Sequence, residues 1–243
     1  MLAVITGASS GLGREFAVQL DKMGYETVLV ARREEKLLEL KKELKNKCEI
    51  LVCDLSKNAE TVFENYPDAD ILINNAGFGI FGEIAGSNFE KDREMIRVNI
   101  EAQYTLLKLY LDKFKEKKHG FILNTASAAA FMAGPYFGLY YASKAFVMRI
   151  SQAAWREAKE YGVCVSALCP GSIDTEFNSV AHTTFSSRPI SAEKAVSYAL
   201  KKMFRGKALI IPTFKIKAAF VMSKLLPEPL LTEFSYRTQK KRF

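Results

Sequence analysis

Histidine and cysteine are scarce in this chain, and their scarcity limits the kinds of site that it can hold. Only two histidines occur, at positions 119 and 182, which argues against a histidine-rich metal centre. The cysteines form two pairs with a separation of five, Cys48 with Cys53 and Cys164 with Cys169. On a strand this separation points the two side chains to opposite faces, and it matches neither a zinc motif nor a disulfide framework. We therefore expect no metal site, and reduced, buried thiols in a cytoplasmic protein.

The sequence also lacks the features of a leader peptide and of a membrane span. A glycine-rich loop begins within the first ten residues, so we expect no signal peptide before the fold. Residues 121–142 carry no charge, but Asn124, Pro135 and Gly138 lie among them. Such residues suit a strand followed by a loop better than a helix that faces lipid.

Acidic residues are fewer than basic ones, and the formal net charge is +8. A basic balance fits nucleic acid, an anionic membrane surface or an anionic small molecule as a partner. Many cations lie beside acids on predicted helices, as in residues 33–36, so solvated helix faces are the simplest interpretation. The basic tail has no aromatic residues interleaved at regular spacing, which argues against a nucleic-acid partner.

Hydrophobic residues make up 49% of the chain, which is enough for one large α/β domain. Short apolar runs predict seven buried strands, at residues 2–5, 27–31, 49–53, 71–73, 120–125, 163–168 and 208–212. Helical patterns alternate with them, at residues 14–23, 34–46, 89–114, 191–204 and 214–226. A further helix carries Tyr140 and Lys144 and continues to about residue 161. The alternation predicts a single-domain Rossmann fold over residues 1–243, with a doubly wound, seven-stranded parallel sheet, helices on both faces and a variable helical tail from about residue 213.

Two parts of the chain fit this scheme less well. Residues 176–189 are polar and aromatic without periodicity, and we expect them to form a mobile lid. Asn99 lies inside the predicted helix over residues 89–114, where asparagine is unfavourable. We interpret it as the mark of a kink or of a bound water, with a surface asparagine as the alternative.

A glycine-rich loop, Thr6-Gly7-x-x-x-Gly11-x-Gly13, joins the first predicted strand to the first helix. Glycines allow a tight turn and the close approach of a pyrophosphate, whose charge then lies at the helix N-terminus. A plain tight turn is the alternative. The order strand, loop, helix favours nucleotide binding.

The second predicted strand ends at Ala31 and is followed by Arg32 and Arg33. An NAD site has an acidic residue here, which binds the ribose 2′-hydroxyl. The missing acid and the guanidinium groups favour the 2′-phosphate of NADP(H) instead. A basic start to the next helix is the alternative.

Polar residues also follow the third and fourth strands. Asp54 could accept a hydrogen bond from an adenine amino group or cap the next helix. The run Asn74-Asn75-Ala76-Gly77 would let a sugar lie against the backbone, although the same residues also form ordinary turns.

Three residues near the fifth strand suggest acid–base chemistry. Tyr140 and Lys144 are four positions apart, so a helix places them on one face. A free phenol has a pKa of about 10, and a neighbouring ammonium lowers that pKa toward the working range. Ser127 follows an apolar run, where its hydroxyl could donate to a carbonyl oxygen. An ordinary exposed helix pair is the alternative.

These motifs, together with Asn99 and Pro170-Gly171-x-x-x-Thr175, stand in the order found in the short-chain dehydrogenase/reductase family, which the chain resembles over about residues 1–212. The glycine spacing is similar to that of the oxidoreductase subtype of about 250 residues. The resemblance implies NADP(H) as the cofactor. By this resemblance, the pyrophosphate and the nearby ribose are bound by Gly7, Ser9, Ser10, Gly11, Leu12 and Gly13. The 2′-phosphate is bound by Arg32, and the adenine by Asp54 and Leu55. The ribose is lined by Asn75, Ala76 and Gly77, and the nicotinamide end by Pro170, Gly171, Ile173 and Thr175.

The same resemblance implies roles in catalysis. Tyr140 is the acid or base that protonates the carbonyl oxygen during reduction of a ketone or aldehyde. Lys144 lowers the pKa of that tyrosine and holds the nicotinamide ribose. Ser127 orients the substrate carbonyl, and Asn99 supports a water-linked proton relay. A non-catalytic NADP(H)-binding sensor or interaction protein on the same fold is the alternative.

The resemblance further implies a homodimer or homotetramer that pairs through helices near residues 99–117 and 139–161. Several apolar residues predict an apolar or acyl-type substrate pocket, namely Phe131, Met132, Tyr136, Phe137, Phe177 and Phe185.

The C-terminal segment carries one apolar stripe at helical spacing, formed by Phe214, Ala218, Val221, Met222 and Leu225. Lysines flank this stripe, so it could lie on an anionic membrane. It could equally pack over the open end of the sheet and close the substrate pocket. Packing is the commoner fate of such a stripe, and we favour it.

Overall fold

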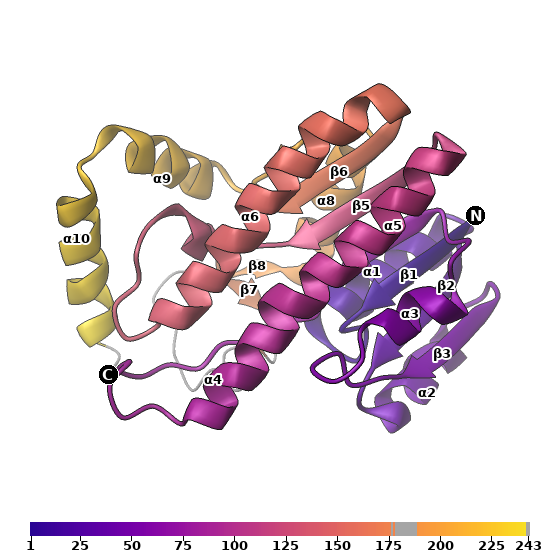
Figure 1. Cartoon of the computed structure of the whole chain (residues 1–243), viewed down its shortest axis with the longest axis horizontal. Coiled ribbons are helices and arrows are strands. Elements are labelled where there is room, and N and C mark those ends of the chain that lie inside the picture. Colours follow the sequence, from indigo (N-terminus) through magenta and orange to yellow (C-terminus); the bar gives the residue numbers. More distant parts are fainter. Residues whose placement is uncertain (176, 178–188, 242–243) are drawn as a thin grey trace.

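All strands of the main sheet run parallel in the computed structural model, in the order β3-β2-β1-β4-β5-β6-β9 (Figure 1). The structure describes residues 1–175, 177 and 189–241. The strands are β1 (Leu2–Thr6), β2 (Glu26–Ala31), β3 (Cys48–Val52), β4 (Ile71–Asn74), β5 (Gly120–Thr125), β6 (Val163–Leu168) and β9 (Leu209–Ile210). The order reverses at β1, since β2 and β3 lie on one side of it and β4 to β9 on the other. Ligands bind outside the carboxyl ends of the strands at such a reversal.

Helices bury both faces of this sheet. One face packs on α1 (Gly11–Lys22), α2 (Glu34–Glu43) and α8 (Ala192–Met203), and the other on α3 (Glu60–Asn65), α5 (Gln103–Lys117) and α6 (Gly138–Ala158). Alternate residues of one strand enter the two cores, so Ile5 belongs to the first and Val4 to the second. Because both faces are covered, the strands are largely apolar. The predicted fold class is confirmed.

The cysteines follow the same geometry. Cys48 lies in the core on one face of the sheet and Cys53 in the core on the other, as their separation predicts. All four cysteines are free thiols. Within the described part of the chain, no three histidine, cysteine or acidic side chains come close enough together to hold a metal ion.

The predicted helix over residues 89–114 has three parts: α4 (Phe89–Ile96), the π-helix η1 (Arg97–Ala102) and α5. Asn99 lies in the π-helix and is fully buried. The interpretation of Asn99 as a local distortion is therefore confirmed, and the surface alternative is wrong. Single π-helical turns occur frequently at functional sites.

Short elements account for most other differences from the predicted scheme. The last strand is two residues long, and an unpredicted pair of strands, β7 (Ile173–Asp174) and β8 (Ile190–Ser191), forms a separate sheet. Two residues are too few to show a periodic pattern. The expected lid at residues 176–189 lies outside the described residues, except for Phe177 and Pro189.

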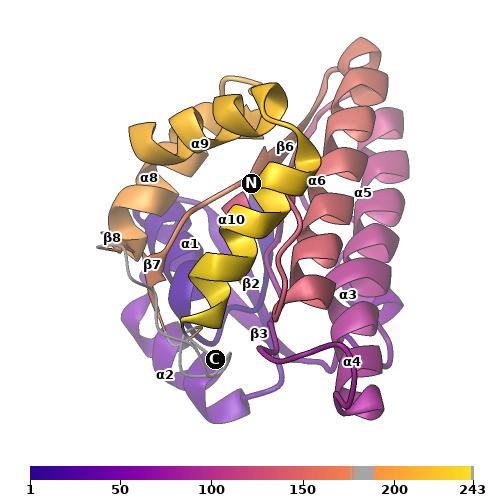
Figure 2. The ribbon, with the colours of Figure 1, turned by 90° about the vertical axis from the view of Figure 1, so that its left-hand side faces the viewer.

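Two helices, α9 (Phe214–Leu225) and α10 (Glu228–Lys240), lie over the carboxyl end of the sheet (Figure 2). The face of α9 that we expected to pack is exposed, including Phe214 and Leu225, so that prediction is wrong. The opposite face packs instead, through Ile216 and Phe220. The reason is that α9 is apolar on more than one side, so spacing alone does not select the buried face. Among the described helices, none combines the length and the apolar character needed to cross a bilayer.

Candidate active site

A cavity of about 620 Å³ lies beyond the carboxyl ends of the strands. All predicted site residues line it except Gly13 and Asn99. Residues after β2 and β3 line the cavity, and so do residues after β6 and from α9 and α10. Because these elements lie on opposite sides of β1 and β4, the cavity spans the point where the strand order reverses.

The glycine loop is shaped by three glycines with different constraints. Gly7 and Gly11 adopt φ values of +66° and +55°, a region that other residues enter only at a cost. A side chain on Gly13 would collide with the carbonyl oxygen of Gly7. The missing side chain at Gly13 therefore lets α1 pack tightly against the loop.

The N-terminus of α1 faces this loop without a side-chain cap. Ser10 is the N-cap residue of α1, but its side chain accepts no capping hydrogen bond from the described residues, and the first turn of α1 contains no acid. The first N–H groups of a helix have no partner within it, and they carry partial positive charge. An uncapped helix start beside the cavity fits the pyrophosphate of a dinucleotide.

Thr6 ties the strand ends together beneath the cavity. Its Oγ1 accepts hydrogen bonds from the backbone N–H groups of Asn75 (2.9 Å) and Ala76 (3.0 Å). The side chain of Asn75 donates to the Thr6 carbonyl (3.1 Å) and accepts from the Thr125 hydroxyl (3.2 Å). The ends of β1, β4 and β5 therefore form one rigid floor.

The two arginines after β2 have different partners. Arg32 forms an ion pair with Glu94 at 2.7 Å, and its side chain is 61% exposed. Arg33 donates to the Ser9 hydroxyl at 3.1 Å, which links it to the glycine loop. Both arginines line the cavity. The resemblance implies a 2′-phosphate contact for Arg32, and the structure places Arg33 at the same cavity.

Asp54 does not cap the next helix, because α3 begins after Ala59, so that alternative is wrong. Its Oδ1 accepts hydrogen bonds from the N–H (3.1 Å) and the hydroxyl (2.8 Å) of Ser56, so it stabilises the turn after β3. Asp54 also lines the cavity. Burial opposes its ionisation, but the bonds from Ser56 outweigh burial and hold the pKa of Asp54 below its usual value.

Tyr140 and Lys144 lie one turn apart on α6, both buried, and Ser127 faces them from the loop after β5. Lys144 Nζ donates to the Thr125 carbonyl at 2.8 Å and lies 5.8 Å from the centre of the Tyr140 ring. Ser127 Oγ accepts from the Ala129 N–H at 3.1 Å, which leaves its proton available for another acceptor. Tyr140 and Lys144 are therefore not an exposed helix pair.

The pKa of Tyr140 is raised, whereas we expected Lys144 to lower it. Burial raises the pKa of Tyr140 above its usual value, and a hydrogen bond with Ser127 only partly opposes this rise. Burial also lowers the pKa of Lys144 to about 8. The ammonium of Lys144 is directed to Thr125 rather than to the phenol oxygen, which explains why it does not lower the pKa of Tyr140. A tyrosine that keeps its proton at neutral pH suits a general acid.

Asn99 lies behind the cavity wall rather than in it. Its side chain accepts from the Phe78 N–H (3.0 Å) and donates to the Phe78 carbonyl (2.8 Å) and to the Ser143 hydroxyl (3.1 Å). Ser143 in turn donates to the Tyr140 carbonyl at 2.7 Å. Asn99 thus joins the π-helix to the loop after β4 and to the helix that carries Tyr140.

The apolar part of the cavity contains four of the six predicted pocket residues, Phe131, Met132, Phe137 and Phe177. Phe137 stacks on Tyr140 with 4.6 Å between ring centres. Tyr136 does not line the cavity and stacks on Tyr236 instead. Phe185 lies outside the described residues.

Helix α10 supplies a wall that the sequence did not reveal. Phe234, Ser235, Thr238 and Gln239 line the cavity, and Gln239 donates to the Tyr141 hydroxyl at 2.9 Å. The buried side of α10 is Leu231, Ser235 and Gln239, two of which are polar. Hydrophobic periodicity cannot identify a buried face made of polar residues.

The fold and this cavity together define an oxidoreductase that uses a nicotinamide nucleotide. Residues 1–184 match the family model for short chain dehydrogenases, and the chain belongs to that family. An uncharacterized oxidoreductase of Staphylococcus epidermidis is 32% identical over 180 residues, which is 72% of this chain and 78% of the relative. A hydroxysteroid dehydrogenase-like protein 1 of Gallus gallus is 31% identical over 241 residues, 93% of this chain and 72% of the relative.

A solved structure gives a similar result. A short-chain dehydrogenase from Sphingobium yanoikuyae in complex with NADPH has a TM-score of 0.84 at 28% identity and covers 91% of both chains. The predicted family is thus confirmed, as is its chemistry at the level of an enzyme that acts on CH–OH or C=O groups.

Proposed function

We propose that this protein is an NADPH-dependent reductase of apolar ketones or aldehydes, with Tyr140 as the proton donor. One observation carries the proposal. Tyr140 is buried, keeps its proton, and lies between the nucleotide cradle and the aromatic wall of one cavity. A proton donor at that position can serve a carbonyl that enters from the apolar side.

Each of the proposed catalytic residues has a separate role in the reduction. When bound, the reduced nicotinamide supplies a hydride to the carbonyl carbon. Tyr140 transfers its phenolic proton to the carbonyl oxygen, and Ser127 donates a hydrogen bond that orients this oxygen. Lys144, whose Nζ donates to the Thr125 carbonyl one helical turn from Tyr140, would bind the nicotinamide ribose. Asn99 holds Phe78 and α6 in place through its hydrogen bonds to the Phe78 backbone and to Ser143, and a water-linked proton relay through Asn99 stays part of the proposal.

The preference for NADPH rests on Arg32 and Arg33. A planar guanidinium binds a phosphate with two parallel hydrogen bonds. Arg33 is already tied to the glycine loop through Ser9, which places a cation beside the pyrophosphate cradle. Arg32 is exposed at the cavity rim, where a 2′-phosphate would compete with Glu94 for it. The NADPH complex of the Sphingobium yanoikuyae relative is consistent with this preference.

A panel of carbonyl compounds tests the proposal. NADPH oxidation should be seen with at least one bulky apolar ketone, aldehyde or acyl compound, and Tyr140→Phe should abolish it while still binding NADPH. A parent protein that binds NADPH tightly yet turns over no carbonyl in a panel of steroid-like, acyl and small polar ketones would support the non-catalytic sensor instead.

We also propose that the protein forms a homodimer or homotetramer through α5 and α6. Their outer side exposes Tyr104 of α5, whose ring packs against Phe146 of α6. Tyr104→Glu should shift the mass measured by light scattering toward the monomer. An unchanged mass would argue against this interface.

A further inference from the structure

Exposed apolar side chains are concentrated on α9 and α10. Fifteen large apolar side chains are exposed in the part of the chain that the structure describes, and seven of them lie between residues 214 and 234. They are Phe214, Val221, Met222, Leu225, Leu226, Leu230 and Phe234. Phe214 is 85% exposed and Leu225 72%. We call these seven side chains the outer apolar face. Contiguous apolar surface on this scale marks an interaction site.

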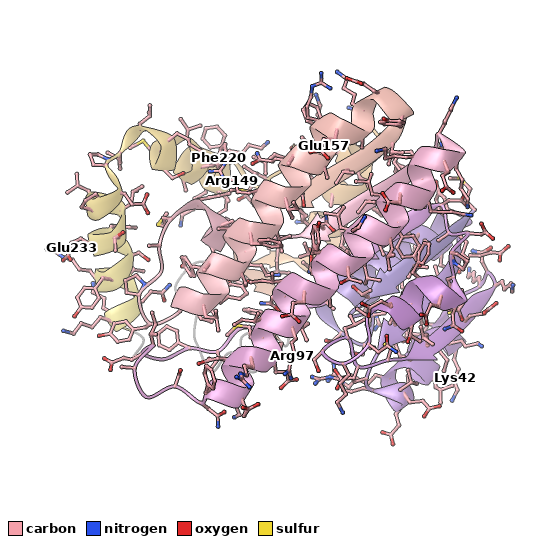
Figure 3. All side chains as sticks on the ribbon, viewed as in Figure 1. Lys42, Arg97, Arg149, Glu157, Phe220 and Glu233 are labelled. Atoms are coloured by element: carbon pink, nitrogen blue, oxygen red, sulfur yellow. The ribbon has the colours of Figure 1, made fainter. Side chains whose placement is uncertain are left out.

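The outer apolar face consists of one row of exposed side chains on each of the two helices. Phe214, Val221 and Leu225 recur at helical spacing on one side of α9. Leu226 follows directly, and Leu230 and Phe234 continue the row one turn apart on α10. The side of α9 with Ile216 and Phe220 packs inward. Figure 1 shows both helices at the outer edge of the molecule, and in Figure 3 Glu233 points outward from α10.

Cations flank the outer apolar face. On a helical projection of α9, Lys215 lies on one side of the apolar row, and Lys217 and Lys224 lie on the other. Helix α9 contains no acid. Over residues 213–241 six cations stand against two glutamates, of which Glu233 is paired with Arg237 at 2.6 Å.

We propose that α9 and α10 dock this protein on an anionic lipid bilayer, with the outer apolar face inserted between headgroups and the lysines at the headgroup level. An apolar row flanked by cations is the pattern of an interfacial helix. A second copy of the chain fits less well, because a two-fold interface would bring the lysines of α9 close to those of the other copy. Of the seven side chains, Phe234 lines the cavity described above and the other six lie outside it.

The position of Phe234 adds a consequence that rests on the proposed function. Phe234 belongs to the outer apolar face and also lines the cavity, beside Ile216 and Ala219 of α9. A docked protein would therefore open its substrate cavity at the lipid surface. The substrate class that this geometry favours is an apolar carbonyl compound that partitions into membranes. Docking itself requires no turnover, so the two proposals can fail separately.

Sedimentation with vesicles tests the docking proposal. The full chain should sediment with vesicles of phosphatidylcholine and phosphatidylserine, and at least about tenfold less with phosphatidylcholine alone. Phe214→Ser/Leu225→Ser and Lys215→Glu/Lys224→Glu should each lower the partition coefficient by at least about tenfold. The matched controls Met23→Ser/Leu38→Ser and Lys22→Glu/Lys42→Glu, which change exposed residues on α1 and α2 or next to them, should bind as the parent does.

A second readout locates the contact without removing apolar surface. Phe214→Trp should show a blue shift of its emission with anionic vesicles, relative to the parent with its single tryptophan. Four results would overturn the proposal: no binding to anionic vesicles, binding that survives Phe214→Ser/Leu225→Ser, a Phe214→Trp spectrum that vesicles leave unchanged, or a larger species in solution that Phe214→Ser/Leu225→Ser dissociates.

Discussion

The ion pair between Arg32 and Glu94 makes the cofactor preference testable in both directions. Arg32→Ala removes a guanidinium that would bind the 2′-phosphate. A hydrogen bond to a charged group contributes about 1.5–3 kcal/mol. The exposed pair with Glu94, at 2.7 Å, must be broken first and offsets up to about 1 kcal/mol of this. With the full offset the net loss is about 0.5–2 kcal/mol, so the Kd for NADPH should rise about two- to thirtyfold, while the Kd for NADH should stay the same.

Glu94→Gln should have the opposite effect on NADPH affinity. It releases Arg32 and removes a negative charge near the expected phosphate, so NADPH should bind up to about fivefold more tightly. Fluorescence titration of both cofactors measures each Kd directly. Arg156→Ala is a matched control, because Arg156 forms an exposed pair with Glu160 at 3.1 Å on α6 and its C-terminal extension. Equal affinity of the parent for NADPH and NADH would refute the reasoning, as would an Arg32→Ala variant that loses both cofactors equally.

Four other residues give sharp expectations. Tyr140→Phe should lower kcat by about a hundredfold or more, since the ring has lost the proton it donates; full turnover would contradict the mechanism. Asn99→Ala removes three hydrogen bonds of a buried side chain. It should lower the melting temperature by several degrees and also lower kcat. An unchanged melting temperature would show that Asn99 does not stabilise the cavity wall. The pKa of Lys144 is about 8 in the folded protein against 10.5 as its ordinary value, so the unfolded chain binds more protons between these values. The contribution of Lys144 to the free energy of unfolding should rise with pH across that window, and parallel urea-unfolding profiles for the parent and Lys144→Met would disprove this. Gln239→Leu should raise KM several-fold without changing the Kd for NADPH, because it touches only the substrate end; a weaker NADPH affinity would argue otherwise.

The parts of the site that the sequence predicted are those whose positions are fixed by the strand order or by the local chain. The glycine loop and the residues after the strands stand next to strongly apolar strands, so their place at the carboxyl end of the sheet follows from topology alone. Gly7, Gly11 and Gly13 could be found because each answers a steric demand that no other residue meets. Tyr140 and Lys144 could be found because one helical turn fixes their relation.

What the sequence could not predict depends on packing between distant elements. Burial of Tyr140 raises its pKa, opposite to the expectation. The Lys144 ammonium is held by the Thr125 carbonyl, nineteen positions earlier, rather than by the phenol oxygen. The π-helix around Asn99 exists because its amide clamps Phe78 on both sides. Nothing in the local sequence shows either contact. The buried face of α9 was likewise decided by its neighbours rather than by its own pattern.

Different segments of the chain supply the proposed catalytic residues and the far wall of the cavity. The proposed catalytic and nucleotide residues all precede residue 176, within the part that matches the family model. The far wall of the cavity comes from α9 and α10, which lie beyond that part. These helices contact the rest of the cavity through few polar bonds, such as the one from Gln239 to Tyr141. Changes in α9 and α10 can therefore alter the size and polarity of the pocket without moving Tyr140, which is anchored by α6 and the π-helix. If the proposed function is right, the last thirty or so residues would select which carbonyl compound reaches Tyr140, while residues before them would set the reaction that it undergoes.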